Sequence, residues 1–278
     1  RDLHSFPTRR SSDLDLPFAL VNNNASKNRL EVMPAYWWMY NMYALNRNMT
    51  KFAKRDKRKK KAQHIVFDPL APDTAEEIIN GRMLLKSWIE QAYLQFDKDK
   101  EHLEVTAFGM EKGKRKTVVL KWAEGYKAYE DMLIYYALNV LADGKTDAPM
   151  PEPLANTTER QREWVNLGGQ LVPQSELDTL IAAVEKGTVD SWQQVHACYD
   201  QWWADYEGWR RRHAYQVLCH LSQQRNLTPE LWQQYLTRYV GILHFVAEQI
   251  KVTREKDNTN PYRRMTYRND AEMESVLG

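Results

Sequence analysis

The chain has 278 residues, of which 39 are Lys or Arg and 37 are Asp or Glu, so its formal net charge is +2. A balance this close to neutral gives no global electrostatic argument for nucleic-acid binding, and the lack of an apolar run of about eighteen residues excludes a membrane-spanning helix. Only Cys198 and Cys219 are present, without a CxxC motif, which argues against a disulfide scaffold or a cysteine-type zinc site and fits a reducing, cytoplasmic compartment.

Residues 1–14 are interpreted as an artefact and not as native protein. The stretch from Arg1 to Leu14 can be back-translated without a mismatch into a widely used sequencing-library adapter. Such a segment carries no information on fold or targeting. Without its three Arg and two Asp, the net charge falls from +2 to +1. The native start is therefore expected to lie upstream of Asp15.

Residues 15–33 are expected to be extended, because a short apolar run there leads into three asparagines, which favour turns. Residues 34–142 form the first predicted helical region. Apolar residues recur at three- and four-residue steps from position 35 to about 54, which predicts one helix, and again from Pro72 to about 96, which predicts a second. Each predicted helix begins at or next to a proline, which is tolerated in a first turn.

Two short segments, residues 103–108 and 117–122, could pair as one small β-hairpin. A third helix is predicted over residues 121–141. It should end at Asp143-Gly144, since glycine readily adopts the left-handed conformation that stops a helix. Residues 143–156 contain three prolines and are the predicted linker.

Residues 157–256 are predicted to form a helical hairpin or bundle. A short helix over 173–186 precedes a long one over 192–220, in which aromatic and apolar residues recur as in a coiled-coil seam. A last helix should cover 229–251. Because a short connection joins the two long helices, they are expected to pack antiparallel. Residues 257–278 form a polar tail, and the fold class is mainly α.

The strongest charge feature is the basic run, Lys51 to Lys61, which holds eight Lys or Arg in eleven residues. Clustered cations bind phosphate groups by releasing counterions, but they also lie at solvated helix ends, where they stabilise the negative pole of the helix dipole. Specific nucleic-acid binding is not expected, because no base-reading element accompanies the run. The residues expected to contact an anionic group are Lys54, Arg55, Lys57 and Arg58.

No metal site and no cofactor is predicted. His213 and His220 lie seven residues apart, which is about 10 Å along a helix and too far for joint zinc ligation. The sequence also contains no HExxH motif, nucleophile elbow, phosphate loop or dinucleotide fingerprint. Catalytic residues are therefore not assigned.

Four stretches together resemble one protein family. They are Leu16-Pro17-Phe18, Lys54–Arg58, Phe67–Pro72 and Asn260–Met265. The set is similar to the C-terminal part of an uncharacterised bacterial family of long hexapeptide-repeat proteins, which look like left-handed β-helix acyl- or nucleotidyltransferases in their N-terminal two-thirds. The resemblance implies that residues 15–278 are a helical accessory or assembly region of a transferase-like protein.

No six-residue repeat occurs in this chain, so the resemblance places the β-helix and its active site upstream, in a missing part of the same protein. That missing domain is the implied partner, together with a second copy of the chain. This fragment alone is not expected to be catalytic. The alternative hypothesis is a free-standing helical module that binds RNA or another polyanion through Lys51–Lys61.

Overall fold

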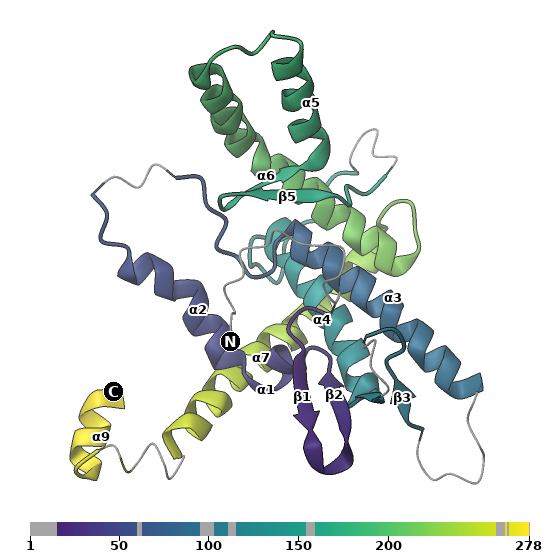
Figure 1. Ribbon diagram of the computed structural model, residues 1–278, viewed down its shortest axis with the longest axis vertical. Coiled ribbons are helices and arrows are strands. Elements are labelled where there is room, and N and C mark those ends of the chain that lie inside the picture. The colour runs from purple at the N-terminus through teal and green to yellow at the C-terminus, as the bar shows by residue number, and fades with distance from the viewer. Residues whose placement is uncertain are drawn as a thin grey trace.

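The computed structural model describes residues 16–59, 63–94, 103–110, 115–153, 159–259, 265 and 267–277. The interpretation of residues 1–14 as an adapter lies outside the described residues, as do Lys60, Lys61 and most of Asn260–Met265. Within the described part the chain is mainly α, as predicted (Figure 1).

The helices are α1 (Tyr36–Tyr40), α2 (Met42–Arg55), α3 (Pro72–Leu94), α4 (Trp122–Leu141), α5 (Gln174–Glu185), α6 (Trp192–Ser222), α7 (Pro229–Thr259) and α9 (Asp270–Leu277). The strands are β1 (Leu20–Asn24), β2 (Arg29–Met33), β3 (Val105–Thr106), β4 (Thr117–Val119), β5 (Trp164–Leu167) and β6 (Gln170–Pro173). Among the described residues, no helix combines the length and the apolar character that crossing a bilayer requires.

The central helix is α4, which packs against α3, α6 and α7. Tyr129, Met132 and Leu133 are completely buried on it. A helix with apolar side chains on most of its circumference belongs in the middle of a core. The main core also contains residues from β2, α1 and α7, so it extends to both sides of the predicted linker.

The described part of that linker lies on the core. Ala148 is buried, and its carbonyl accepts a hydrogen bond from Trp232 Nε1 at 2.9 Å. Met150 packs against the same cluster. Residues 143–153 therefore do not separate two independent cores.

The helix predicted from residue 35 to about 54 is divided into α1 and α2. Asn41 between them has a φ of −144°, which is not helical. The first turn of α2 is capped from α7, because Thr253 Oγ1 accepts a hydrogen bond from the backbone N–H of Tyr43 at 2.9 Å. This contact satisfies one of the free N–H groups at a helix start and fixes α2 against α7.

The long helices α6 and α7 follow each other as predicted, but they diverge from their connection, α6 toward the top of Figure 1 and α7 toward the lower left. α6 packs mainly against α4, and α7 packs against both α2 and α4, instead of along each other. The aromatic seam of α6 packs against two different elements. Trp202 packs with Val172 of β6, whereas His213 contacts Tyr136 of α4.

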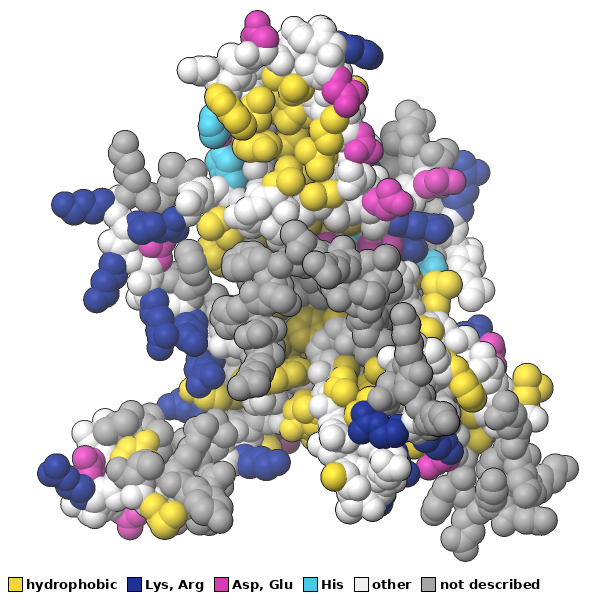
Figure 2. Space-filling model, viewed as in Figure 1, with side chains coloured by type: hydrophobic (Ala, Val, Ile, Leu, Met, Phe, Trp, Pro, Cys, Tyr) yellow, Lys and Arg dark blue, Asp and Glu magenta, His cyan; other side chains and the backbone are white. Residues whose placement is uncertain are grey.

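The strands β5 and β6 form an antiparallel hairpin that supports α5 and the first half of α6. Its turn is Gly168-Gly169, with φ values of 66° and 110° that favour glycine. We call α5 and the first half of α6, residues 174–209, the acidic lobe. It lies at the top of Figure 2, where hydrophobic side chains gather on its surface.

The second sheet has the strand order β1-β2-β4-β3. The predicted hairpin of residues 103–108 and 117–122 is present as the antiparallel pair β3 and β4. Residues 15–33, expected only to be extended, contain a second hairpin, in which Leu20 lies opposite Met33. Its turn is closed by Asn24, whose side chain accepts the N–H of Lys27 at 3.1 Å.

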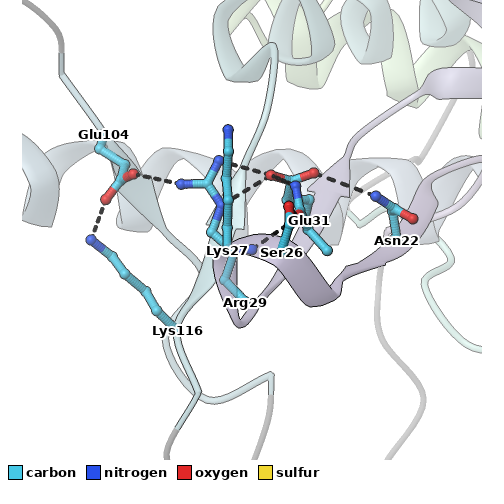
Figure 3. Close-up of polar contacts among 8 residues, drawn as sticks. Asn22, Ser26, Lys27, Arg29, Glu31, Glu104 and Lys116 are labelled. Carbon is cyan, nitrogen blue, oxygen red and sulfur yellow. Dashed lines mark hydrogen bonds and ion pairs between the residues drawn. The ribbon is translucent and has the colours of Figure 1, made fainter.

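A polar network crosses this sheet (Figure 3). Glu31 accepts hydrogen bonds from Arg29 at 2.8 Å and from Asn22 at 3.4 Å. The hydrogen bond from Arg29 is the main cause that lowers the pKa of Glu31. Arg29 also contacts Glu104 at 3.2 Å, and Glu104 pairs with Lys116. Two cations therefore meet two carboxylates, so the network ties the sheet together and has no surplus charge for a ligand.

Candidate functional site: an arginine pocket

A hollow of about 620 Å³ lies between α3, the segment before β5 and the C-terminal end of α6. Four arginines from distant parts of the chain line it, together with a histidine and a carboxylate. These residues are Arg82, Arg160, Arg162, Arg225, His220 and Glu159. We call this hollow the arginine pocket.

Arg82 comes from the middle of α3 and is held in place by α4. Its guanidinium lies 4.4 Å from the ring centroid of Tyr126, and it pairs with Glu130. A cation over an aromatic face is attracted by the ring and fixed in orientation. The Nε atom of Arg82 is buried without a hydrogen-bond partner among the described residues.

Arg160 is anchored at the inner wall of the pocket. Its Nε donates to Glu76 Oε1 at 2.6 Å and its Nη2 donates to Glu76 Oε2 at 3.3 Å. The carboxylate of Glu76 is only 7% exposed. This two-bond arrangement is the geometry in which a guanidinium binds a carboxylate most strongly, and it fixes the position of Arg160.

The same carboxylate continues into the core. Glu76 Oε1 lies 2.9 Å from His213 Nε2, and His213 Nδ1 lies 2.9 Å from the hydroxyl of Tyr136. Burial lowers the pKa of His213, so the ring is neutral near neutral pH. The network then assigns the proton to Nε2, which donates to Glu76, while Tyr136 donates to Nδ1.

The two histidines considered from the sequence thus have different roles. His213 is buried in the polar chain just described, and His220 lies in the arginine pocket. Among the described residues, no three His, Cys, Asp or Glu side chains come close enough to hold a metal ion.

The electrostatic environment of His220 is positive. Partial burial lowers its pKa most, and the charges of Arg160, Arg82 and Arg162 lower it further. Glu76 acts in the opposite direction. Three arginines therefore disfavour a further positive charge at the position of His220, and the same field favours a negative one.

Two of the four arginines in the pocket, Arg162 and Arg225, carry positive charge that no carboxylate partner in the described part of the chain offsets. Arg160 is matched by Glu76 and Arg82 by Glu130, whereas Arg162 and Arg225 have no ion-pair partner among the described residues. Glu159 is the carboxylate in the lining and reduces the surplus. The pocket nevertheless contains more positive than negative groups.

The C-terminal end of α6 lies beside the arginine pocket, and hydrogen bonds to its last carbonyl groups reduce their repulsion of an anion. The carbonyl groups at a helix C-terminus carry partial negative charge and repel anions. Two of them are occupied in α6, because the N–H of Gln224 donates to the carbonyl of Cys219 at 3.0 Å and the N–H of Gln223, which has a φ of 56°, donates to the carbonyl of His220 at 3.3 Å. The turn also brings Arg225 into the pocket.

Cys219 also lines the pocket, but its thiol is not a nucleophile. Burial raises its pKa to about 11, so it is protonated near neutral pH. The thiolate is the reactive form of cysteine.

The residues predicted from the basic run lie elsewhere. Lys54 and Arg55 end α2, Lys57 and Arg58 follow it, and all four are exposed. Arg58 is held by its own segment, since it donates to Asp56 Oδ1 at 2.8 Å and also contacts Gln63. None of the four lines the arginine pocket.

Sequence reasoning missed the arginine pocket, because its residues are separated by up to 143 positions and no short motif joins Arg82 to Arg225. The available signal was local. Arg160 and Arg162 flank one residue just before β5, and Arg225 follows the end of a long helix. Cations at element ends commonly bind nearby partners, but the pattern does not say which.

The chain matches the family model of a domain of unknown function, DUF6819, over residues 151–235. The pocket residues other than Arg82 lie in that range. An uncharacterised protein of Treponema pallidum (strain Nichols) is 41% identical over 283 residues. The alignment covers 96% of this chain and 39% of the relative, so the chain spans well under half of that protein. No solved structure matches.

The predicted resemblance to a hexapeptide-repeat family is wrong. The matching family model is DUF6819, and the described residues form helices and two small sheets instead of a β-helix. The stretches that suggested the resemblance have a local explanation. Lys54–Arg58 is an exposed helix end and the following segment, where solvent favours charged residues in any family.

Proposed function

We propose that this chain is a helical binding module whose arginine pocket holds a small molecule carrying phosphate or carboxylate groups. The observation that carries the proposal is that four arginines from distant parts of the chain, Arg82, Arg160, Arg162 and Arg225, line one hollow beside His220. Guanidinium groups bind phosphate and carboxylate oxygens with two parallel hydrogen bonds.

The size of the pocket supports a small molecule as the ligand. Its volume of about 620 Å³ lies within the roughly 300–1,000 Å³ of typical small-molecule sites. The side chains of Gln223 and Gln224 add neutral donors and acceptors to the lining. A ligand with one or two anionic groups and a polar body fits this combination.

The experiment is calorimetric titration with pyrophosphate and with citrate, as probes for phosphate and carboxylate ligands. The test variant is the double substitution Arg162→Gln and Arg225→Gln, which removes the surplus charge without disturbing Glu76. The control is Lys127→Gln with Lys251→Gln, two exposed positions outside the pocket. We expect at least one probe to bind saturably, about tenfold or more weakly to the test variant, and within about twofold of wild type to the control. The absence of saturable binding by wild type, or an equal loss in both variants, would contradict the proposal.

The basic run supports a second proposal, the contact with a polyanion expected from the sequence. Lys54, Arg55 and Lys57 are exposed, which is what such a contact needs. Its test is a salt titration of RNA binding. Counterion release predicts weak binding that is lost by about 0.2 M salt, whereas sequence-dependent binding that persists above about 0.5 M salt would replace it with specific recognition.

The role as a helical accessory or assembly region also remains a proposal. It is supported by the longer relative, of which this chain matches 39%. The transferase activity expected of the parent protein rested on the hexapeptide resemblance and has lost that support.

A further inference from the structure

The acidic lobe exposes large apolar side chains. Ile181 and Val184 on α5 are 47% and 48% exposed, and Trp192 at the start of α6 is 76% exposed. Figure 2 shows hydrophobic side chains gathered over this lobe. A contiguous apolar surface of this kind marks an interaction site more often than a solvated one.

The same lobe is strongly negative. Residues 174–209 contain seven Asp or Glu and a single Lys. The carboxylates are Glu176, Asp178, Glu185, Asp190, Asp200, Asp205 and Glu207. Glu185, Asp190 and Trp192 are all exposed and close in sequence. A partner for this surface should therefore combine positive charge with an apolar contact.

The chain itself carries such a surface at the end of α2. The described residues 51–59 contain six Lys or Arg and one acidic residue, and Lys54, Arg55 and Lys57 are exposed. Met49, which precedes them on the same helix, is 41% exposed. In Figure 2, Lys and Arg side chains gather at the left over α2 and the segment after it.

Within one copy these two surfaces are not joined in the described part of the chain. No ion pair there links Lys54, Arg55 or Lys57 to a carboxylate of the acidic lobe. Between the two surfaces in sequence lies His64, which contacts Asp200 at 2.7 Å and stacks on Trp203. The charges of these three exposed cations can therefore be matched by a second copy.

We propose that two copies of this chain associate through these surfaces, with Met49 to Lys59 of one copy seated on the acidic lobe of the other. If the exchange is reciprocal, each dimer contains two equal contacts and the assembly closes. The exposed ring of Trp192 then becomes buried, and the like charges within each surface, which repel one another in the monomer, are neutralised.

The experiment is sedimentation velocity over a range of concentrations, with two charge-reversal variants of the full chain. One is Glu185→Lys with Asp190→Lys, in the lobe, and the other is Lys54→Glu with Lys57→Glu, in the basic run. Each variant alone should dimerise at least about tenfold more weakly than wild type, because the attraction between the two surfaces falls and the reversed side chains face like charges in both contacts. An equimolar mixture of the two variants should recover dimerisation, since the mixed dimer contains one contact between wild-type surfaces and one in which both charges are reversed.

Two further measurements separate this contact from other causes. Trp192→Ala should weaken dimerisation at unchanged charge, whereas Lys127→Glu with Lys251→Glu, at exposed positions outside both surfaces, should leave it within about twofold. A wild-type chain that stays monomeric up to about 100 µM, a concentration typical of weak association, would overturn the proposal, and so would a mixture that does not recover. The wild-type chain would also sediment as a monomer if the basic run contacted the acidic lobe of its own copy, or if the lobe bound a different protein.

Discussion

Arg160 and His213 share one carboxylate oxygen: Glu76 Oε1 lies 2.6 Å from Arg160 Nε and 2.9 Å from His213 Nε2. Arg160 lines the arginine pocket, and His213 is completely buried. A single buried side chain therefore sets the position of a pocket residue and satisfies a core histidine. Changes in this carboxylate should affect both the stability of the chain and the shape of the pocket.

Glu76→Gln should destabilise the chain by about 3 kcal/mol, because the substitution leaves Arg160 with a buried charge and no counterion. Urea unfolding of wild type and variant measures the difference in free energy. The matched control is Glu104→Gln, which also loses ion pairs, with Arg29 and Lys116. Glu104 is 43% exposed, so its loss should cost less than about 1 kcal/mol. Equal, small losses at both positions would show that Glu76 is not a buried counterion.

Stability should fall as the pH is lowered through the range in which histidines titrate. Burial lowers the pKa of His213 from its usual value of 6.5, so the unfolded chain takes up a proton there before the folded chain does. The free energy of unfolding must then decrease as the pH falls below about 6.5. Urea midpoints at about pH 7.5 and 5.5 test this, and His213→Gln should reduce the difference between them. His220 contributes in the same direction, since its pKa is also lowered. The substitution His220→Gln measures how much of the pH dependence of stability comes from His220.

An anion bound in the arginine pocket should raise the pKa of His220. Arg160, Arg82 and Arg162 help to lower that pKa in the unliganded chain, and a negative ligand offsets their charge. NMR titration of the histidine ring resonances with and without pyrophosphate measures the change. The ring of His196, which contacts Trp192 and Tyr199 near the start of α6, should show no ligand-induced change in chemical shift. A pKa of His220 that does not move while calorimetry reports binding would place the ligand elsewhere.

The helices were predictable because their signals are local. Prolines begin α3 and α7 within the predicted boundaries, and apolar stripes followed α4 and α6 for most of their lengths. At the start of α6, Gln194 Oε1 accepts the N–H of Asp190 at 2.8 Å, a local contact between residues four positions apart.

The tertiary relationships were not predictable, for a physical reason. The seam of α6 has the spacing of a coiled coil, but spacing shows only that one face is buried and does not identify the neighbour. That neighbour is β6 at Trp202 and α4 at His213. The arginine pocket depends in the same way on packing, because α3 brings Arg82 beside the segment that holds Arg160. The basic run, by contrast, was visible in the sequence because it is contiguous.

Gly125 should be intolerant of any side chain, although it lies inside a helix where alanine is usually better. A Cβ atom placed there would lie 2.9 Å from Pro34 Cβ and 3.2 Å from the carbonyl oxygen of Pro34. That approach is closer than van der Waals contact and involves backbone, which cannot move without displacing the start of α1. We therefore expect Gly125→Ala to destabilise the chain by about 1–3 kcal/mol through overpacking.

Two other helical glycines provide the matched controls for this prediction. At Gly208 in α6 and Gly241 in α7, no neighbouring atom lies within 4 Å of the position that a Cβ would occupy. Alanine at either site should stabilise the chain by up to about 1 kcal/mol, because it reduces the conformational freedom of the unfolded chain and favours the helix. Thermal and urea unfolding of the three single variants measures whether each substitution raises or lowers the free energy of unfolding. If Gly125→Ala stabilises the chain as the other two do, then α4 does not pack against Pro34 at the distance described.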